Sequence, residues 1–130
     1  MKRLVSSVAV SGLILTAAAA VAPGASADER VCRGYIGKVV VDDILVPRGA
    51  TCSMYGTRVK GNIKVEAGGG ASIRTNDVDG DIQVFSNRSG SKNIYDNRVA
   101  GNLQCKSNYP APKGARNKVQ GNKEGQCRRF

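Results

Sequence analysis

The chain has no histidine and no tryptophan, and its 130 residues include only four tyrosines and two phenylalanines. Without histidine, neither a serine nor a cysteine can be activated by the usual imidazole base. No G-x-S-x-G sequence is present, and Gly68-Gly69-Gly70 lacks the lysine that follows in a phosphate-binding loop. The tyrosines are too few and too irregularly spaced to stack nucleic-acid bases. We therefore expect neither an enzyme nor a cofactor, and no specific nucleic-acid partner.

A signal peptide is predicted for residues 1–27. Lys2 and Arg3 form a positive start, and residues 4–22 are mostly apolar and small. Ala25-Ser26-Ala27 matches an A-x-A cleavage site, so the mature chain is expected to begin at Asp28. A membrane anchor is the alternative, because the apolar run approaches membrane-spanning length. The small residues and the cleavage site favour a secreted protein, in which residues 28–130 form one small domain.

One short pattern recurs along this domain at a nearly constant spacing. Its clearest copies are Val59–Val65, Val78–Val84 and Val99–Cys105, and a degraded copy begins at Val119. Val40–Val46 is interpreted as the first copy, with aspartate in the place of glycine. The steps between the opening valines are 19, 19, 21 and 20 residues, and a fixed period of this length is typical of repeat proteins.

Apolar and polar residues alternate inside each copy, which is the period of a β-strand. Residues 28–35 are interpreted as a polar lead-in, and residues 36–46, rich in Val and Ile, as a strand. The repeat predicts an all-β, single-domain β-solenoid (a parallel β-helix) of about five coils of about 20 residues, with one or two short strands each. The leucine frame of leucine-rich repeats is missing. A β-sandwich would not repeat the same side chain at the same place in every unit.

Stacked coils place equivalent residues in columns about 4.8 Å apart. The expected core columns are Val40/Val59/Val78/Val99/Val119, Ile44/Ile63/Ile82/Leu103, Val46/Val65/Val84/Cys105 and Met54/Ile73/Ile94. Two polar columns, whose side chains can hydrogen-bond between coils, are Asn76/Asn97/Asn117 and Asn62/Asp81/Asn102/Asn122. The glycines at 61, 80, 101 and 121 are expected to allow a tight bend.

The four cysteines follow the same period. Cys32 and Cys52 are 20 residues apart, and Cys105 and Cys127 are 22 apart. Three pairings are open from sequence alone, but the stacking of adjacent coils favours Cys32–Cys52 and Cys105–Cys127. Each bridge would close a loop of about 20 residues and contribute roughly 3 kcal/mol on chain-entropy grounds. A metal site is disfavoured, because the chain has no C-x-x-C pair and no histidine.

The acidic segment from Asp77 to Asp81 is the strongest candidate for chemistry. Its three carboxylates stand at alternate positions and could bind Ca²⁺ or act on a polysaccharide. As an EF-hand it fails, because the sixth position is Ile82 and the twelfth is Arg88. A charge ladder between coils is favoured instead: Asp77 would stack beside Arg58 and Arg98, and Asp79 beside Lys60. No metal ligand and no catalytic residue is therefore assigned.

Positive charge is the remaining functional signal. Without Lys2 and Arg3, the domain carries 18 basic and 10 acidic residues, a net charge of +8. A charge of this size attracts polyanions, and outside the membrane the expected partners are anionic cell-wall polymers. The candidate polyanion-binding residues are Arg58, Lys60, Lys64, Arg98 and Lys118. A charged surface kept for solubility is an equally good interpretation of the same residues.

The V-x-G-N repeats, the first cysteine pair and the C-terminal sequence Gly101-Asn102-Leu103-Gln104-Cys105 … Gly125-Gln126-Cys127 are characteristic. On these motifs the chain resembles small secreted repeat proteins of filamentous actinobacteria, over nearly the whole domain. The resemblance implies a β-solenoid and brings no catalytic residues. The V-x-G-N spacing is also similar to that of bactofilins, cytoskeletal solenoids that polymerise end to end. Bactofilins lack signal peptides and disulfides, so only their coil pattern is comparable.

The sequence thus favours a secreted, non-enzymatic structural protein that associates with the cell wall or cell surface through a basic face. A basic antimicrobial or effector protein is the second hypothesis, and a polysaccharide-active enzyme is the third. Self-association through unpaired end coils is a further expectation. Pro110, Pro112 and the tail Arg128-Arg129-Phe130 would partly oppose it by capping. No membrane contact is expected after cleavage.

Overall fold

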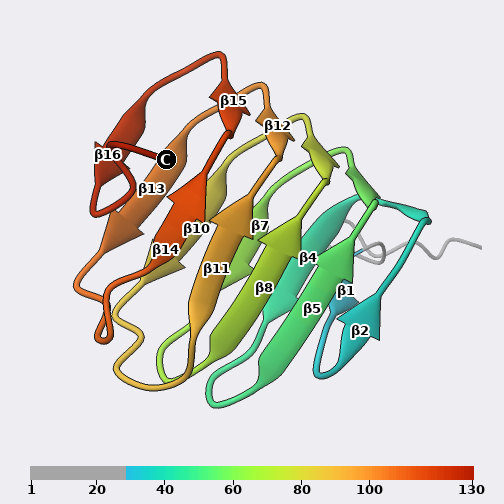
Figure 1. Cartoon of the computed structure of the whole chain (residues 1–130). Helices are drawn as coiled ribbons and strands as arrows, with labels where there is room; N and C mark the ends of the chain where they lie inside the picture. Colours follow the sequence, from blue (N-terminus) through green and yellow to red (C-terminus); the bar gives the residue numbers. More distant parts are fainter. Residues whose placement is uncertain (1–28) are drawn as a thin grey trace, which may run out of the picture.

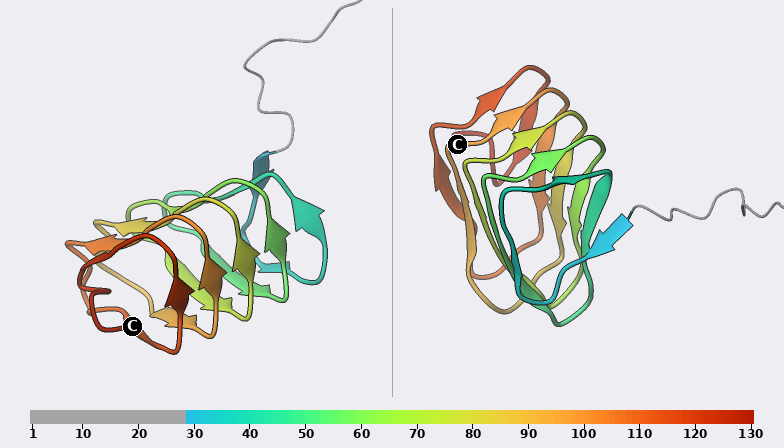
Figure 2. Two further views of the ribbon diagram at one scale, coloured as in Figure 1. Left: turned by 90° about the horizontal axis from the view of Figure 1, so that it is seen from above. Right: turned by 90° about the vertical axis from the view of Figure 1, so that its right-hand side faces the viewer.

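The computed structural model describes residues 29–130 and shows a chain wound into stacked, three-sided coils (Figure 1). Sixteen strands follow one another, and every third strand joins the same sheet. All strand pairings are parallel, and no helix occurs between residues 29 and 130. The coils lie nearly over one another when the molecule is viewed end-on (Figure 2, right). The predicted β-solenoid of about five coils is confirmed, whereas the predicted signal peptide lies outside the described residues.

Each coil passes through three sheets in a fixed order. Sheet A contains β1 (Glu29–Val31), β4 (Asp43–Val46), β7 (Ile63–Val65), β10 (Ile82–Phe85), β13 (Leu103–Lys106) and β16 (Lys123–Gly125). Sheet B contains β2 (Tyr35–Ile36), β5 (Thr51–Tyr55), β8 (Gly70–Arg74), β11 (Lys92–Tyr95) and β14 (Lys113–Ala115). Sheet C contains β3 (Val40–Val41), β6 (Arg58–Val59), β9 (Asp77–Val78), β12 (Arg98–Val99) and β15 (Lys118–Val119). A coil therefore has three short strands, more than the one or two that were predicted.

The strand register confirms the core columns, with one correction. The columns that begin at Ile44, Val46 and Met54 are aligned as predicted. The remaining column begins at Val41 and not at Val40, because Val41 pairs with Val59 and is buried. Val40 is 62% exposed. In the first coil two residues separate Val41 from Ile44, whereas three separate Val59 from Ile63, and a slip of one residue turns a strand side chain to the opposite face.

The start of the domain is more finely divided than predicted. Residues 36–46, predicted as one strand, contain the last residue of β2 and the whole of β3 and β4, because the chain turns two corners within this stretch. Ile36, Val41 and Ile44 are buried, one in each strand. In the sequence they look like the apolar residues of one continuous strand, so the corners between them are not visible. The polar lead-in contains β1, whose Glu29 pairs with Asp43 at the edge of sheet A.

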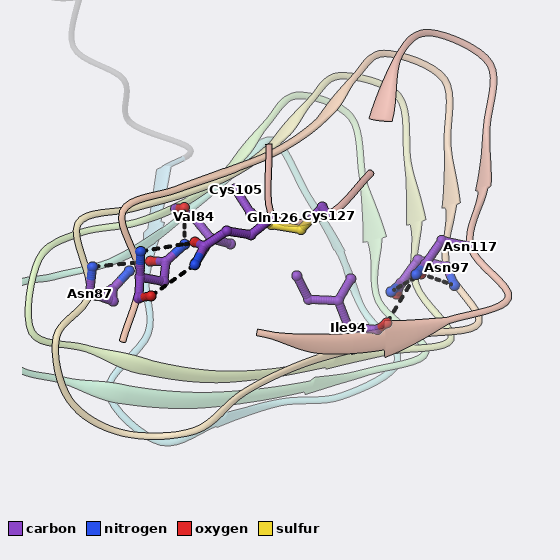
Figure 3. Close-up of a disulfide and its surroundings, with 9 residues drawn as sticks. Val84, Asn87, Ile94, Asn97, Cys105, Asn117, Gln126 and Cys127 are labelled. Carbon is purple, nitrogen blue, oxygen red and sulfur yellow. Dashed lines mark hydrogen bonds between the residues drawn. A yellow bond between two sulfur atoms is a disulfide. The ribbon is translucent and has the colours of Figure 1, made fainter. Parts of the chain in front are cut away.

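The predicted column Asn76/Asn97/Asn117 is a buried hydrogen-bond ladder at the corner between sheets B and C. The Oδ1 atom of Asn97 accepts from the backbone N–H of Asn76 at 2.9 Å, and its Nδ2 donates to the Ile73 carbonyl at 2.9 Å. Asn117 repeats both contacts one coil further on, with Asn97 N–H and with Ile94 O (Figure 3). Each amide thus satisfies backbone groups of the preceding coil that no water reaches.

The second predicted ladder lies at the exposed corner between sheets C and A. Asn62 Oδ1 accepts from the Asp81 N–H at 2.8 Å, and Asp81 Oδ1 accepts from the Asn102 N–H at 2.7 Å. Asn122 N–H donates in turn to Asn102 Oδ1 at 2.8 Å. These oxygens face the following coil, whereas those of the first ladder face the preceding one. The two ladders therefore link consecutive coils by side-chain acceptors of opposite orientation, one toward the preceding coil and one toward the following coil.

A third ladder, at the corner between sheets A and B, was not predicted. The Asn87 N–H donates to Asn108 Oδ1 at 3.0 Å, and the Asn108 N–H donates to Gln126 Oε1 at 2.9 Å (Figure 3). Asn87 also begins the sequence Asn87-Arg88-Ser89, which has the form of a glycosylation sequon. Its amide is fully buried, and its Nδ2 donates to Phe85 O at 3.2 Å. The folded domain therefore does not present this asparagine for modification.

Two corners require left-handed backbone, and non-glycine residues adopt it. Thr75, Asp96 and Arg116 precede the three asparagines of the first ladder and have φ values of 56°, 58° and 57°. Ser86 and Ser107 precede the ladder residues Asn87 and Asn108 in the same way. This conformation turns the chain so that the next side chain enters the interior, although it is unfavourable for residues with a Cβ atom.

The glycines at 61, 80, 101 and 121 lie at bends, as expected, but a left-handed backbone is not the reason that glycine is needed there. None of them has a positive φ, so they do not serve a left-handed bend. A Cβ atom on Gly80 would lie 2.6 Å from the Gly61 carbonyl oxygen, and the other three glycines are equally close to the preceding coil. The close approach of consecutive coils at this corner is what excludes a side chain.

Both predicted disulfides are confirmed. Cys32, after β1, is bonded to Cys52 in β5, with a Cα–Cα distance of 5.6 Å. Cys105 in β13 is bonded to Cys127, which follows β16, with a Cα–Cα distance of 5.3 Å. The bridges therefore secure the first and the last coils, where a stack has a neighbour on one side only.

The two ends of the solenoid differ in how they are covered. At the C-terminal end, Phe130 is partly buried against the core, and its ring lies directly over Gly114. At the N-terminal end, the first coil exposes the large apolar side chains Val31, Val39 and Val40. Strands β1, β2 and β3 form one edge of each sheet, so this end presents unpaired backbone groups.

The interior also contains a lysine that was not anticipated. Lys92 occupies the place taken by Cys52 and Ala71 in the two preceding coils, and is 2% exposed. Its Nζ atom donates to three backbone carbonyls at 3.1–3.3 Å, those of Asn87, Ser89 and Tyr109. Burial lowers the pKa of this amine from its ordinary value. The lysine thus ties two consecutive A/B corner loops together.

The first ladder should contribute far more stability than the second. Replacing Asn97 by Ala leaves the buried Asn76 N–H without its acceptor and the Ile73 carbonyl without this donor. We expect a loss of roughly 2–5 kcal/mol in the free energy of unfolding. The matched variant Asn62→Ala frees the Asp81 N–H at an exposed corner, where water replaces the lost contact, and should cost about 1 kcal/mol or less. Urea unfolding of the two variants measures both values, and equal losses would contradict this ranking.

Candidate polyanion interface

Three of the five candidate basic residues form one outward column on sheet C. Arg58 in β6 and Arg98 in β12 both pair with Asp77, and Lys118 in β15 pairs with Arg98. Lys60 directly follows β6. The fifth residue, Lys64, lies in β7 of sheet A, on another side of the coil. The structure thus brings three of the candidates to one sheet, with Lys60 just beyond the end of β6, and places Lys64 apart from them.

Arg58 is neutralised by the acidic segment. Its guanidinium contacts the carboxylates of Asp77 at 2.6 Å and Asp79 at 3.0 Å. The predicted stacking of Asp77 beside Arg58 is confirmed, but Asp79 pairs with Arg58 and not with Lys60, because the longer guanidinium spans two alternate positions. Asp81 belongs to the second amide ladder. Across residues 29–130, no three acidic or cysteine side chains are grouped to hold a metal ion.

A charge pair stands at the corner between sheets B and C. Arg116 contacts Asp96 of the preceding coil through two bonds, from Nε at 2.6 Å and from a terminal nitrogen at 3.0 Å. The left-handed backbone at both positions directs the two side chains outward from the same corner. The hydrogen bond from Arg116 lowers the pKa of the Asp96 carboxyl, and the same bond raises the pKa of Arg116.

Beside this corner lies an aromatic and basic column on sheet B. Arg74 in β8 pairs with Tyr55 on one side and Tyr95 on the other. The Arg74 guanidinium lies 4.7 Å from the Tyr95 ring centroid, and that of Arg116 lies 5.7 Å from it. The tyrosines looked irregular in the sequence. Tyr55 and Tyr95 are in fact separated by two repeat periods, which is the signal that could have placed them in one column.

Arg98, Arg116 and Lys118 surround a shallow hollow, and we name these three residues the B/C edge. Asp96 also lines the hollow and is paired with Arg116, and the amides of Asn97 and Asn117, which complete the lining, are engaged in the buried ladder. Among the described residues Arg98 and Lys118 form no ion pair, since the salt bridges there involve only Arg58 and Arg116. An exposed guanidinium and an ammonium side by side are suited to phosphate or carboxylate oxygens.

The comparisons add no family to these observations. Comparison with protein-family models, curated proteins and solved structures gave no match. Between residues 29 and 130 there is also no helix of sufficient length and apolar character to span a bilayer. The interface is therefore interpreted from its own residues.

The Asp96–Arg116 pair should make stability depend on acid pH. Because the pKa of Asp96 is lowered in the folded chain, its contribution is complete above the ordinary carboxyl pKa of about 4 and is lost as the pH falls below it. Asp96→Asn keeps a residue that tolerates the left-handed backbone but cannot ionise. The melting temperature of the wild type should exceed that of the variant by a constant amount from about pH 8 to pH 5, and the difference should shrink below about pH 4. A difference that persists at about pH 2.5 would contradict the assignment.

Proposed function

We propose that the domain is a secreted, non-enzymatic structural protein that binds anionic polymers of the cell wall or cell surface through its B/C edge. One observation carries the proposal. Arg98 and Lys118 stand in register on adjacent strands and form no salt bridge with any described residue, because the neighbouring Asp77 is engaged by Arg58 and Asp96 by Arg116. Unpaired cations held next to each other at an exposed edge favour a polyanion over a neutral ligand.

The solenoid suits this role because its edge is rigid. Consecutive coils present their side chains at a spacing of about 4.8 Å, so a polymer lying parallel to the long axis meets Arg98 in one coil and Arg116 and Lys118 in the next. Buried ladders and parallel sheets hold these positions before the ligand arrives. Little ordering is then required on binding, and several individually weak contacts add to a useful affinity.

Secretion forms part of the same proposal. Two disulfides are consistent with an oxidising, extracellular environment. Residues 1–27 would direct export and be removed, as in the actinobacterial proteins that the chain resembles. Self-association, where it occurs, would use the N-terminal coil, because Val31, Val39 and Val40 are exposed beside its edge strands, whereas Phe130 packs against the core at the other end.

Removing the unpaired cations should weaken polyanion binding in a salt-dependent manner. The double variant Arg98→Ser/Lys118→Ser leaves the ladders and the Asp96–Arg116 pair in place. For this variant, the slope of the logarithm of the binding constant against the logarithm of the salt concentration should be less steep than for the wild type by roughly 1 to 1.5. About 0.7 counterions are released per contact on a single-stranded polyelectrolyte, and two contacts are removed. Co-sedimentation with isolated cell walls across a salt series, with and without their anionic polymers, measures this slope.

A charge-matched variant separates a local site from a general charge effect. Lys64→Ser/Lys106→Ser removes two positive charges from sheet A, away from the B/C edge. It should keep the wild-type slope within error. Equal losses in both double variants would refute a localised interface, and absence of wild-type binding at low salt would refute the wall-associated role.

Export and cleavage can be checked on the secreted product. Intact-mass and N-terminal analysis of protein collected from the culture medium should give a chain that begins at Asp28 and contains two disulfides. Reduction should add four hydrogens to the mass, two for each bridge. A product that stays in the membrane fraction with Met1 intact would instead support a membrane anchor.

A further inference from the structure

A second basic hollow lies at the opposite end of the sheet B strands. It is lined by Arg48, Gly49, Ala67, Gly68, Ser86 and Arg88, at the corner between sheets A and B. Two turns build it: the Ala50 N–H closes the first on Pro47 O at 3.0 Å, and the Gly69 N–H closes the second on Glu66 O at 3.3 Å. Both turns have a left-handed glycine at the third position, Gly49 or Gly68.

These turns are stacked on one another and on the following coil. The Gly49 N–H donates to Ala67 O at 3.1 Å, and the Ser89 hydroxyl donates to Gly68 O at 3.1 Å. Arg48 and Arg88 therefore belong to coils that are two steps apart, about 9.6 Å along the long axis. Both side chains are exposed. We name these two arginines the A/B edge.

Neither arginine of the A/B edge forms a salt bridge with a residue between 29 and 130, whereas Arg116 of the B/C edge is paired with Asp96. Within the described part of the chain, the ion pairs involve only Arg58 and Arg116, so neither arginine of the A/B edge is neutralised. Glu66 is the one carboxylate in the two turns, and it forms no ion pair with Arg48 or Arg88. Two exposed guanidiniums on one corner can each contact an anionic oxygen with two N–H groups.

The two edges are too far apart to act as one site. The chain crosses the A/B corner before each sheet B strand and the B/C corner after it, so the strands span the distance between the edges (Figure 1). β5 and β8 have five residues each, and such strands are about 16 Å long. A polymer that lies along one edge, parallel to the long axis, does not reach the other.

We propose that the A/B edge is a second polyanion site, so that one molecule cross-links two anionic polymer chains. This inference rests on the proposed function of the B/C edge and adds a partner to it. Its ligand class is the same, a polymer that bears repeated phosphate or carboxylate groups. The consequence is a change of role, from a protein that coats a polymer to one that joins polymers together.

A capture assay tests cross-linking directly. Long-chain inorganic polyphosphate is coupled sparsely to beads by one end, the mature disulfide-bonded protein is loaded, and soluble fluorescent polyphosphate is then added. The wild type should retain the fluorescent polymer on the beads. Arg48→Ser/Arg88→Ser should still bind the beads through the B/C edge but should retain about tenfold less fluorescent polymer. The charge-matched control Arg128→Ser/Arg129→Ser should behave as the wild type.

The outcomes separate the two proposals. If the Arg48→Ser/Arg88→Ser variant retains as much fluorescent polymer as the wild type, the second site is refuted while the B/C edge stands. The control variant retaining as little as the A/B variant would also refute it, because net charge and not the corner would then be responsible. If the wild type does not bind the beads at all, both proposals fail. Thermal melts of the variants show whether each remains folded.

Discussion

The constraint on which this fold depends is that every coil must satisfy its buried polar groups through the coils next to it. The three parallel sheets do this for the strands, and the amide ladders do it for the corners. At the B/C corner Asn97 holds the preceding coil through both its oxygen and its nitrogen. Buried amides of this kind fix the register strongly, since a displaced coil would leave them without partners.

These internal contacts also determine where the exposed charged side chains lie. A left-handed residue directs the ladder asparagine inward at each B/C corner, and the same turn leaves Asp96 and Arg116 outside, one above the other. Arg98 and Lys118 follow at a fixed offset in sheet C and are therefore aligned as well. Interactions in the interior, which no ligand contacts, thus set the positions of the surface charges, one coil spacing apart. The B/C edge and the A/B edge are separate because each lies at a corner, and each of these corners has its own buried ladder.

Much of the fold follows from the period of the sequence, and the exceptions have physical causes. The core columns can be predicted where the period is constant, as for the column that contains Ile44, Ile63 and Ile82. Val40 was misplaced because a shortened coil moves the alternation by one residue. The third ladder escaped notice because its steps are 21 and 18 residues and its last member is Gln126. Lys92 lies two residues before Ile94 and therefore on the same inward face, but the three carbonyls that make a buried lysine tolerable come from two loops and have no sequence signal.

The candidate interface was only partly predictable for a related reason. Sequence spacing shows which cations share a column, but not which of them a carboxylate neutralises. Arg58 was a candidate for polyanion binding, but Asp77 and Asp79 neutralise it.

The location of the disulfides affects how such a chain can evolve. Both bridges join residues of the end coils, so the coils between them carry no covalent link to a particular neighbour. An internal duplication of one period would therefore lengthen each ladder and each edge by one step while both disulfide-bonded ends stay intact, so the length of the rod can change without loss of either bridge.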